Sequence, residues 1–193
     1  NRQIELSIDK NDVDALERIF PSLFDGSPPV VILVPGGAFG TSKCWPAIRF
    51  AETADRLIRD HDAKVIISVA PNEIEEQIAA SICEDSKNEL YNLANTPLAL
   101  GQLKALYSKA TLVITNDTGP RHIAMALGRK VVTLFGPNDP AWTKPDYDDE
   151  IEIVGTADCV PCAKPKCYKE EHLCMISISV DQVVNAAEEL LGR

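Results

Sequence analysis

The segment Ile114–Ala124, ITNDTGPRHIA, indicates both the fold class and the position of a ligand site. The run Thr111–Thr115 that leads into it is apolar and rich in β-branched residues, which is typical of a buried strand. Pro120 suits the first helical position, where a missing N–H is harmless, so a helix should follow directly. Backbone N–H groups at a helix start, with the positive end of the helix dipole, attract anions. The segment therefore predicts a strand-to-helix corner suited to an anion such as a sugar phosphate.

Four residues at this corner have suitable chemistry. Asp117 can accept hydrogen bonds from sugar hydroxyls, and Thr118 can cap the helix or donate to a phosphate oxygen. Gly119 allows close approach of the backbone, and His122 lies in the first turn near the same anion. The alternative is a well-capped helix with a satisfied histidine. The clustering of these residue types at one corner favours ligand binding.

Alternating strand and helix patterns continue over the rest of the chain. The expected strands are Val30–Val34, Lys64–Val69, Leu90–Leu93, Thr111–Thr115, Lys130–Leu134 and Ile151–Val154. The expected helices are Pro46–Asp60, Asn72–Ile82, Pro97–Lys109 after a Thr96 cap, Pro120–Leu127 before Gly128, and a last helix begun by a capping box at Ser179-x-x-Gln182. Repeated βα units predict an α/β fold, a three-layer α/β/α, Rossmann-like parallel sheet with its ligand beyond the carboxyl ends of the strands.

The chain is expected to form a single domain over residues 1–193, a length that allows a sizeable core. Its parts are a lead-in segment at 1–28 with a short strand and a helix, a cysteine-rich loop at 155–178, and a C-terminal helix at 179–193. Because the sequence does not begin with Met, we expect it to be a piece of a longer protein.

The composition restricts the class of ligand. The chain has a formal net charge of −10 at pH 7, so we expect no nucleic acid partner, which would need basic patches. A small phosphorylated ligand remains compatible, since a few local donors can outweigh a distant net charge. We expect no transmembrane segment, because no apolar run approaches the length of a membrane span.

A glycine-rich loop, Pro35–Lys43 (PGGAFGTSK), follows the first expected strand. Its glycines allow backbone N–H groups to face an anion, while Thr41, Ser42 and Lys43 add two hydroxyls and a positive charge. The spacing is neither that of a Walker A loop nor that of the GxGxxG fingerprint. A flexible turn with an exposed lysine is the alternative. Trp45, just after the loop, is expected to be a packing residue.

Three acidic residues follow the second long strand. One of Glu73, Glu75 and Glu76 could accept hydrogen bonds from ribose hydroxyls. The alternative for each is a solvated position in a first helical turn, where acidic side chains suit the helix dipole.

Four cysteines cluster late in the chain, at Cys159, Cys162, Cys167 and Cys174. This spacing could hold a structural metal, although its gaps are shorter than in most zinc modules. Reduced thiols in a loop are an equal alternative, and disulfides are a third in an oxidising compartment.

Three stretches together resemble the lipopolysaccharide heptosyltransferases, the ADP-heptose-using glycosyltransferase family 9 with the GT-B fold. Thr115–Pro140, TNDTGPRHIAMALGRKVVTLFGPNDP, is similar to a signature that reads TNDTGPxHxAxALGxxVVxLFGPxxP. Pro35–Pro46, PGGAFGTSKCWP, is similar to an earlier PGAxxGxxKxWP signature, and Cys159–Met175 to a CxPC…C…CM stretch of many members. The resemblance extends from Val30 onward and is closest to heptosyltransferase II.

The resemblance implies an architecture and a reaction. Such enzymes have two Rossmann-like domains, and this chain resembles the C-terminal half, which binds the nucleotide sugar. The implied function is inverting transfer of heptose from ADP-heptose to a hydroxyl of the lipopolysaccharide inner core. The catalytic base and the acceptor site would belong to an N-terminal domain that this chain lacks. The resemblance implies no catalytic cofactor, and a cytoplasmic location at the inner face of the inner membrane.

The resemblance also implies roles for single residues. Lys43, with Thr41 and Ser42 in its loop, would contact the diphosphate, to which Thr118 and Gly119 would offer donors. Asp117 would bind heptose hydroxyls, and His122 would stabilise charge on the departing ADP. Glu73 or Glu75 would bind the ribose, and Leu98 would border the adenine. The sequence departs from the family pattern at Cys44, where Arg is frequent, and at Arg121, where Met is frequent.

Two other functions remain as alternatives. The first is a transferase of the same fold that uses another nucleotide sugar. The second is a non-enzymatic nucleotide-binding or metal-binding module built around the cysteines.

Overall fold

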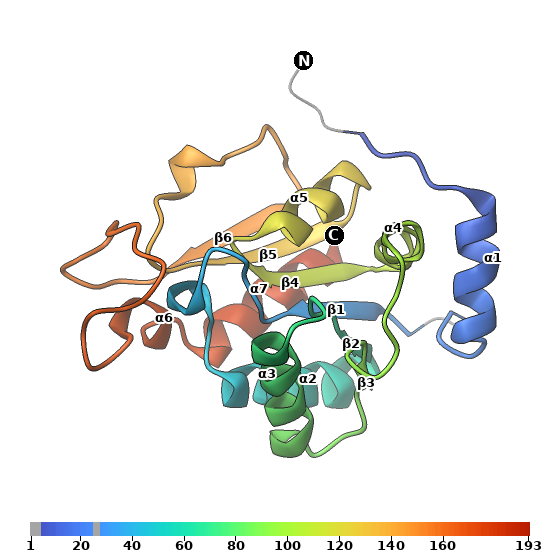
Figure 1. The fold of residues 1–193 in the computed structure, drawn as a ribbon, viewed down its shortest axis with the longest axis horizontal. Coiled ribbons are helices and arrows are strands. Elements are labelled where there is room, and N and C mark those ends of the chain that lie inside the picture. The colour runs from blue at the N-terminus through green and yellow to red at the C-terminus, as the bar shows by residue number, and fades with distance from the viewer. Residues whose placement is uncertain (1–4, 25–27) are drawn as a thin grey trace.

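The computed structural model describes residues 5–24 and 28–193. Its centre is a parallel sheet of six strands in the order β3-β2-β1-β4-β5-β6 (Figure 1). The strands are β1 Val30–Val34, β2 Lys64–Ile67, β3 Tyr91–Asn92, β4 Leu112–Asn116, β5 Lys130–Phe135 and β6 Glu150–Val154. The order reverses between β1 and β4, which is the switch point where ligands of such sheets bind.

Helices cover both faces of the sheet (Figure 1). One face packs on α1 Lys10–Ile19, α4 Leu100–Lys109 and α5 Gly119–Ala126. The other packs on α2 Ala47–His61, α3 Glu73–Asp85 and α7 Val180–Gly192. The short elements are η1 Thr41–Lys43, η2 Pro140–Trp142 and α6 Leu173–Ile176. The predicted three-layer α/β/α fold is confirmed.

The strand sequences explain this layering. All five residues of β1 are buried, because a strand covered on both faces has no solvated side. Val31 and Leu33 belong to the core under α2 and α7, whereas Ile32 and Val34 belong to the core under α4 and α5. Because side chains alternate along a strand, neighbouring residues of β1 belong to two separate cores, one on each face of the sheet.

The strand register brings three loops together. Val34 pairs with Thr115 across β1 and β4, and Asn116 pairs with Leu134 across β4 and β5. The glycine-rich loop, the corner at Asp117 and the loop after Phe135 therefore leave the sheet side by side.

Several helix-end predictions are confirmed. Ser179 and Gln182 form the predicted capping box of α7. Gly128 follows α5 with a φ of 68°, a left-handed conformation that favours glycine. The helix expected over Asn72–Ile82 is α3, which Asn72 caps by accepting a hydrogen bond from the backbone N–H of Glu75 and which runs on to Asp85.

Other boundary predictions are wrong. The helix expected from Pro97 begins at Leu100, because the Gln102 side chain accepts from the N–H of Ala99 and caps the helix there. Thr96 lies instead in a turn, donating its N–H to the carbonyl of Leu93. The lead-in strand is absent from residues 5–9. Residues 1–4 and 25–27 of the lead-in segment lie outside the described residues.

The cysteine-rich loop contains an unexpected short helix, α6, and Gly192 belongs to the last turn of α7 rather than following it. Within the described part of the chain, we find no helix long and apolar enough to cross a membrane.

Candidate functional site

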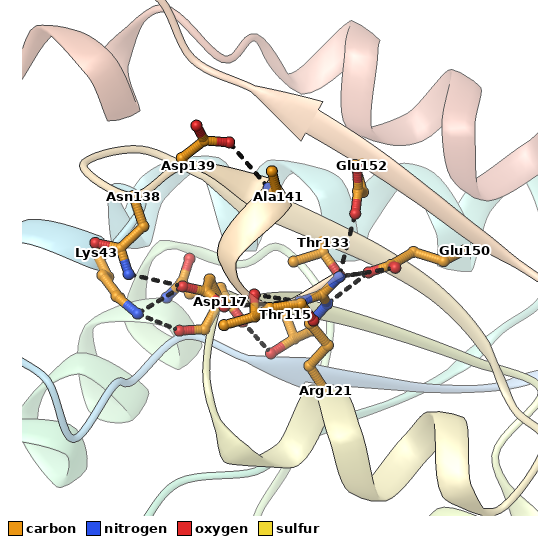
Figure 2. Close-up of polar contacts among 12 residues, drawn as sticks. Lys43, Thr115, Asp117, Arg121, Thr133, Asn138, Asp139, Ala141, Glu150 and Glu152 are labelled. Atoms are coloured by element: carbon orange, nitrogen blue, oxygen red, sulfur yellow. Dashed lines mark hydrogen bonds and ion pairs between the residues drawn. The ribbon is translucent and has the colours of Figure 1, made fainter. Parts of the chain in front are cut away.

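Three loops at the carboxyl edge of the sheet converge on Asp117 (Figure 2). Lys43, from the loop after β1, donates from Nζ to Oδ2 of Asp117 at 2.6 Å and to its carbonyl oxygen at 2.8 Å. Asn138, from the loop after β5, donates from Nδ2 to the same Oδ2 at 3.0 Å. Lys43 and Asp117 are both buried, so the alternative of an exposed lysine in a flexible turn does not hold.

Asn116, the last residue of β4, links the corner to the glycine-rich loop. Its Nδ2 donates to the carbonyl oxygens of Pro35 at 2.6 Å and Gly36 at 3.2 Å, and the side chain is fully buried. The backbone that precedes Lys43 is thereby held against the last residue of β4.

The environment favours an ionised Asp117. Burial alone would raise its pKa, but hydrogen bonds from Lys43 and Asn138 and the charges of Lys43 and Arg121 outweigh burial and lower the pKa. A buried carboxylate held in the charged form is a strong acceptor for ligand hydroxyls.

The environment of His122 favours the neutral imidazole. Burial lowers its pKa first and the charge of Arg121 lowers it further, against the opposing charges of Asp117 and Glu150. A neutral imidazole can still donate one N–H to an anion.

Two cavities adjoin at the start of α5. The larger holds about 350 Å³, and its apolar wall includes Val34, Val69, Leu93, Leu98 and Leu103. The smaller holds about 250 Å³, and it is lined by Phe39, Lys43, Asp117, His122, Asn138 and Thr143. Ala38, Thr118 and Gly119 line both. A cavity walled mainly by apolar side chains thus meets a cavity that charged and polar side chains reach, at the predicted anion-binding helix start.

Thr118 holds the N-cap position of α5, but its side chain does not cap the helix. Its buried hydroxyl has no hydrogen-bond partner among the described residues. Such a hydroxyl can donate to a phosphate oxygen, the second of the two roles predicted for it.

Glu73, Glu75 and Glu76, which the sequence could not separate, differ in position. Glu76 lines the larger cavity but is exposed. Glu75 lines the larger cavity, where its Oε2 accepts from the N–H of Ala70 at 2.9 Å and lies against Gly36. Glu73 is exposed and accepts from Gln77 one turn along α3. The geometry favours Glu75 as the acceptor of ribose hydroxyls.

Neither Thr41 nor Ser42 lines the two cavities described above. The Ser42 hydroxyl donates to the carbonyl of Lys164 at 2.5 Å, and its N–H donates to that of Pro165. Thr41 is exposed at the start of η1. Both were predicted to contact substrate; in this structure Ser42 instead fastens the glycine-rich loop to the cysteine-rich segment.

Trp45 is a packing residue, as expected. It is buried against Phe50 in an edge-to-face contact, and its Nε1 donates to the carbonyl of Ile178 at 3.0 Å. Cys44, beside it, has a pKa raised to about 11 by burial and by the charge of Glu75, so its thiol stays protonated.

The cysteine cluster consists of free thiols. All six cysteines of the chain are unpaired, and no group of three or more metal-ligating side chains forms among residues 5–24 and 28–193. Burial, then the neighbouring cysteines, raises the pKa of Cys174. The structure thus forms no disulfide within this cluster.

Sequence reasoning missed three residues of the site. Asn138, Thr143 and Phe39 line the smaller cavity with Lys43 and Asp117. The signal for Asn138 was its place after a buried strand that neighbours the corner. Thr143 lies eight residues beyond β5 and gave no such signal.

Comparison with known proteins agrees with this geometry. The sequence model of glycosyltransferase family 9 (heptosyltransferase) matches residues 1–173. The chain belongs to glycosyltransferase family 9. Lipooligosaccharide heptosyltransferase 2 of Haemophilus influenzae is 30% identical over 171 residues, which cover 87% of this chain and 49% of that protein. The protein of the same name from Campylobacter jejuni serotype O:2 is 28% identical, covering 89% and 54% respectively.

Solved structures of this family share the fold. Escherichia coli ADP-heptose lipopolysaccharide heptosyltransferase II matches with a TM-score of 0.77 and 26% identity, over 97% of this chain and 53% of that one. A family 9 glycosyltransferase of Veillonella parvula matches with a TM-score of 0.82 and 28% identity, over 99% and 54%. The family 9 chain described here thus spans about half the length of the relatives it matches.

Proposed function

We propose that this chain is the donor-binding half of a heptosyltransferase and that its ligand is ADP-heptose. The observation that carries the proposal is the pair of cavities that adjoin at Thr118 and Gly119. An apolar compartment suits a nucleobase, and a compartment with a buried carboxylate suits a sugar. The start of α5 between them suits a diphosphate.

The adenosine occupies the larger cavity. Leu98 and Leu93 form an apolar wall for the base, and Glu75 accepts from the ribose hydroxyls. The sugar occupies the smaller cavity, where Asp117 accepts from its hydroxyls and Asn138 holds the carboxylate in place. This assignment uses the polarity of each compartment and leaves the diphosphate in the middle.

The diphosphate lies against the start of α5. Lys43 supplies the positive charge, and the Thr118 hydroxyl and the first N–H groups of the helix supply donors. These local groups counter the formal charge of −10 of the whole chain. Because they also neutralise charge on a leaving ADP, we expect the reaction to need no catalytic metal.

The reaction is an inverting displacement at the anomeric carbon. An acceptor hydroxyl loses its proton to a base and forms the new C–O bond while the bond to the diphosphate breaks and ADP leaves. Lys43, the helix start and an N–H of His122 stabilise the departing charge. The base and the contacts to the lipopolysaccharide inner core come from the remainder of the protein, which works in the cytoplasm at the inner membrane.

Calorimetric titration with ADP-heptose, ADP, UDP and GDP tests the proposal. We expect binding of ADP and ADP-heptose, with Lys43→Met as a variant that weakens both. Preference for UDP or GDP would favour another nucleotide-sugar transferase. Failure to bind every nucleotide, together with metal bound in purified protein, would favour the non-enzymatic module.

A further inference from the structure

We propose that Arg121 is a positioning residue for the donor sugar. Two acidic side chains of β6 anchor Arg121, and Arg121 in turn holds the Asp117 carboxylate in place. The inference deepens the proposed function and rests on it. Its basis is a network of charges that links Asp117 in the sugar cavity, through Arg121, to Glu150 and Glu152 on the edge strand β6 (Figure 2).

The guanidinium of Arg121 is locked in place. Its Nε and Nη2 donate to the two carboxylate oxygens of Glu150 at 2.6 and 2.9 Å, and Nη2 also donates to Glu152 at 3.2 Å. It lies 4.9 Å from the centre of the Phe135 ring, and the side chain is fully buried. A two-pronged pair of this kind fixes direction as well as charge.

The remaining nitrogen points toward the sugar cavity. Nη1 of Arg121 donates to Oγ1 of Thr143 at 3.0 Å and lies 3.8 Å from Oδ1 of Asp117. The Thr143 hydroxyl, which accepts from Arg121, has its proton free to donate to the same Oδ1 at 3.4 Å. Lys43 and Asn138 hold the other oxygen, Oδ2. Asp117 is therefore oriented through both oxygens. Because Lys43 and Asn138 hold Oδ2, the oxygen available to a sugar hydroxyl is Oδ1, which lies beside Arg121.

The charges around Asp117 come from three elements. They are Lys43 from η1, Arg121 and the titratable His122 from α5, and Glu150 and Glu152 from β6. Glu150 and Glu152 partly neutralise Arg121, so the electrostatic stabilisation that Arg121 gives the ionised Asp117 carboxylate depends on both glutamates. Removing Arg121 and removing Glu150 should therefore change the ionisation of Asp117 in opposite directions.

Two variants test this. The first is Arg121→Met with Glu150→Gln, since a buried ion pair replaced as a unit is often tolerated. We expect it to bind ADP within about twofold of wild type and ADP-heptose about tenfold more weakly, the loss of one charged hydrogen-bond network. The second is Glu150→Gln alone, which keeps an acceptor for the Thr133 hydroxyl.

The decisive readout is the pH dependence of the ratio of ADP-heptose to ADP affinity, because effects on the phosphates cancel in that ratio. Asp117 must be ionised to accept from the sugar. The acid limb of the ratio should move to higher pH in the double variant, because the cation that is removed lies 3.8 Å from Oδ1 of Asp117, whereas the anion removed with it is the one that pairs with Arg121. It should move to lower pH in Glu150→Gln, which loses an anion.

An unchanged affinity ratio and acid limb in both folded variants would overturn the inference and leave Arg121 a structural role alone. If the double variant does not fold, Glu150→Gln decides by itself through the direction of its shift. If wild-type protein binds ADP but shows no preference for ADP-heptose at any pH, the proposed function has failed instead.

Discussion

Nζ of Lys43 lies 2.6 Å from Oδ2 of Asp117, and both side chains are more than nine-tenths buried. The pair joins the loop after β1 to the corner after β4, two segments that are neighbours only because β1 and β4 pair in parallel. Each charge satisfies the other before any ligand arrives. A diphosphate that approaches Lys43 and a sugar that approaches Asp117 therefore meet groups already held in position, which lowers the ordering cost of binding.

Substitutions of Lys43 and Asp117 should have different effects on the binding of ADP and of ADP-heptose. Lys43→Met should weaken ADP and ADP-heptose alike, because its charge acts on the diphosphate. Asp117→Asn should weaken ADP-heptose and spare ADP, because its charge acts on the sugar. Each loss should be about 10- to 100-fold, as for a hydrogen bond to a charged group. Calorimetry at one pH measures both. Equal weakening of ADP and ADP-heptose by Asp117→Asn would contradict the sugar assignment.

Gly119→Ala should block binding without unfolding the protein. A Cβ at Gly119 would meet no atom within 4 Å, yet this residue lines both cavities at the point where the diphosphate should lie. Because alanine favours helices, the free energy of unfolding should stay equal or rise by up to about 1 kcal/mol.

The matched control is Gly192→Ala, in the last turn of α7, where a Cβ also meets no atom within 4 Å. Both variants should unfold at or above the wild-type temperature, but only Gly119→Ala should lose affinity for ADP. Wild-type ADP affinity in Gly119→Ala would show that the backbone at this position does not approach the ligand.

The depressed pKa of His122 predicts a pH dependence of stability. The unfolded chain takes up the proton near pH 6.5, whereas burial and then Arg121 delay uptake in the folded protein to lower pH. Above pH 6.5 the residue is neutral in both states and has no effect. As the pH falls below 6.5, the unfolded state binds the proton first and the folded state loses stability.

His122→Gln should remove this dependence. Urea unfolding between pH 8 and pH 5.5 should show a shallower decline for the variant than for wild type, with a constant difference above pH 7. Parallel curves over the whole range would mean that His122 titrates normally in the folded protein.

The parts of the fold that could be predicted are those set by local patterns. Apolar runs such as Val30–Val34 and the corner at Asp117 depend on neighbours in sequence, and the structure places them as expected. The start of α4 was mispredicted because Thr96 and Pro97 resemble a helix start, while the Gln102 side chain makes the actual cap at Ala99.

The contacts between distant segments could not be predicted. A charged residue in a first helical turn is ordinarily solvated, so nothing around Arg121 indicated that it would be fully buried. Its partner Glu150 is 29 residues away, and the partner of the Ser42 hydroxyl is 122 residues away. Such pairings depend on strand order and loop paths that hydrophobic periodicity does not encode.

The attachment of the cysteine-rich segment to the glycine-rich loop gives the last prediction. Gly40 has a φ of 145°, and a Cβ there would lie 2.1 Å from the carbonyl oxygen of Pro165. Gly40→Ala should therefore strain the loop and separate it from this segment, which Ser42 otherwise holds. The strain should lower the free energy of unfolding by about 1–3 kcal/mol.

Because Lys43 lies three residues further along the same loop, Gly40→Ala should also weaken ADP binding. Release of the cysteine-rich segment should increase the rate at which Cys162 and Cys167 react with a thiol reagent. The control is Gly128→Ala, which has a φ of 68° and an open space for its Cβ at the end of α5. It carries backbone strain of its own away from the segment, in the left-handed region that other residues also enter, so it should lose less stability than Gly40→Ala while ADP affinity and thiol reactivity stay at wild-type values. If Gly40→Ala binds ADP like Gly128→Ala, the segment does not support the donor loop.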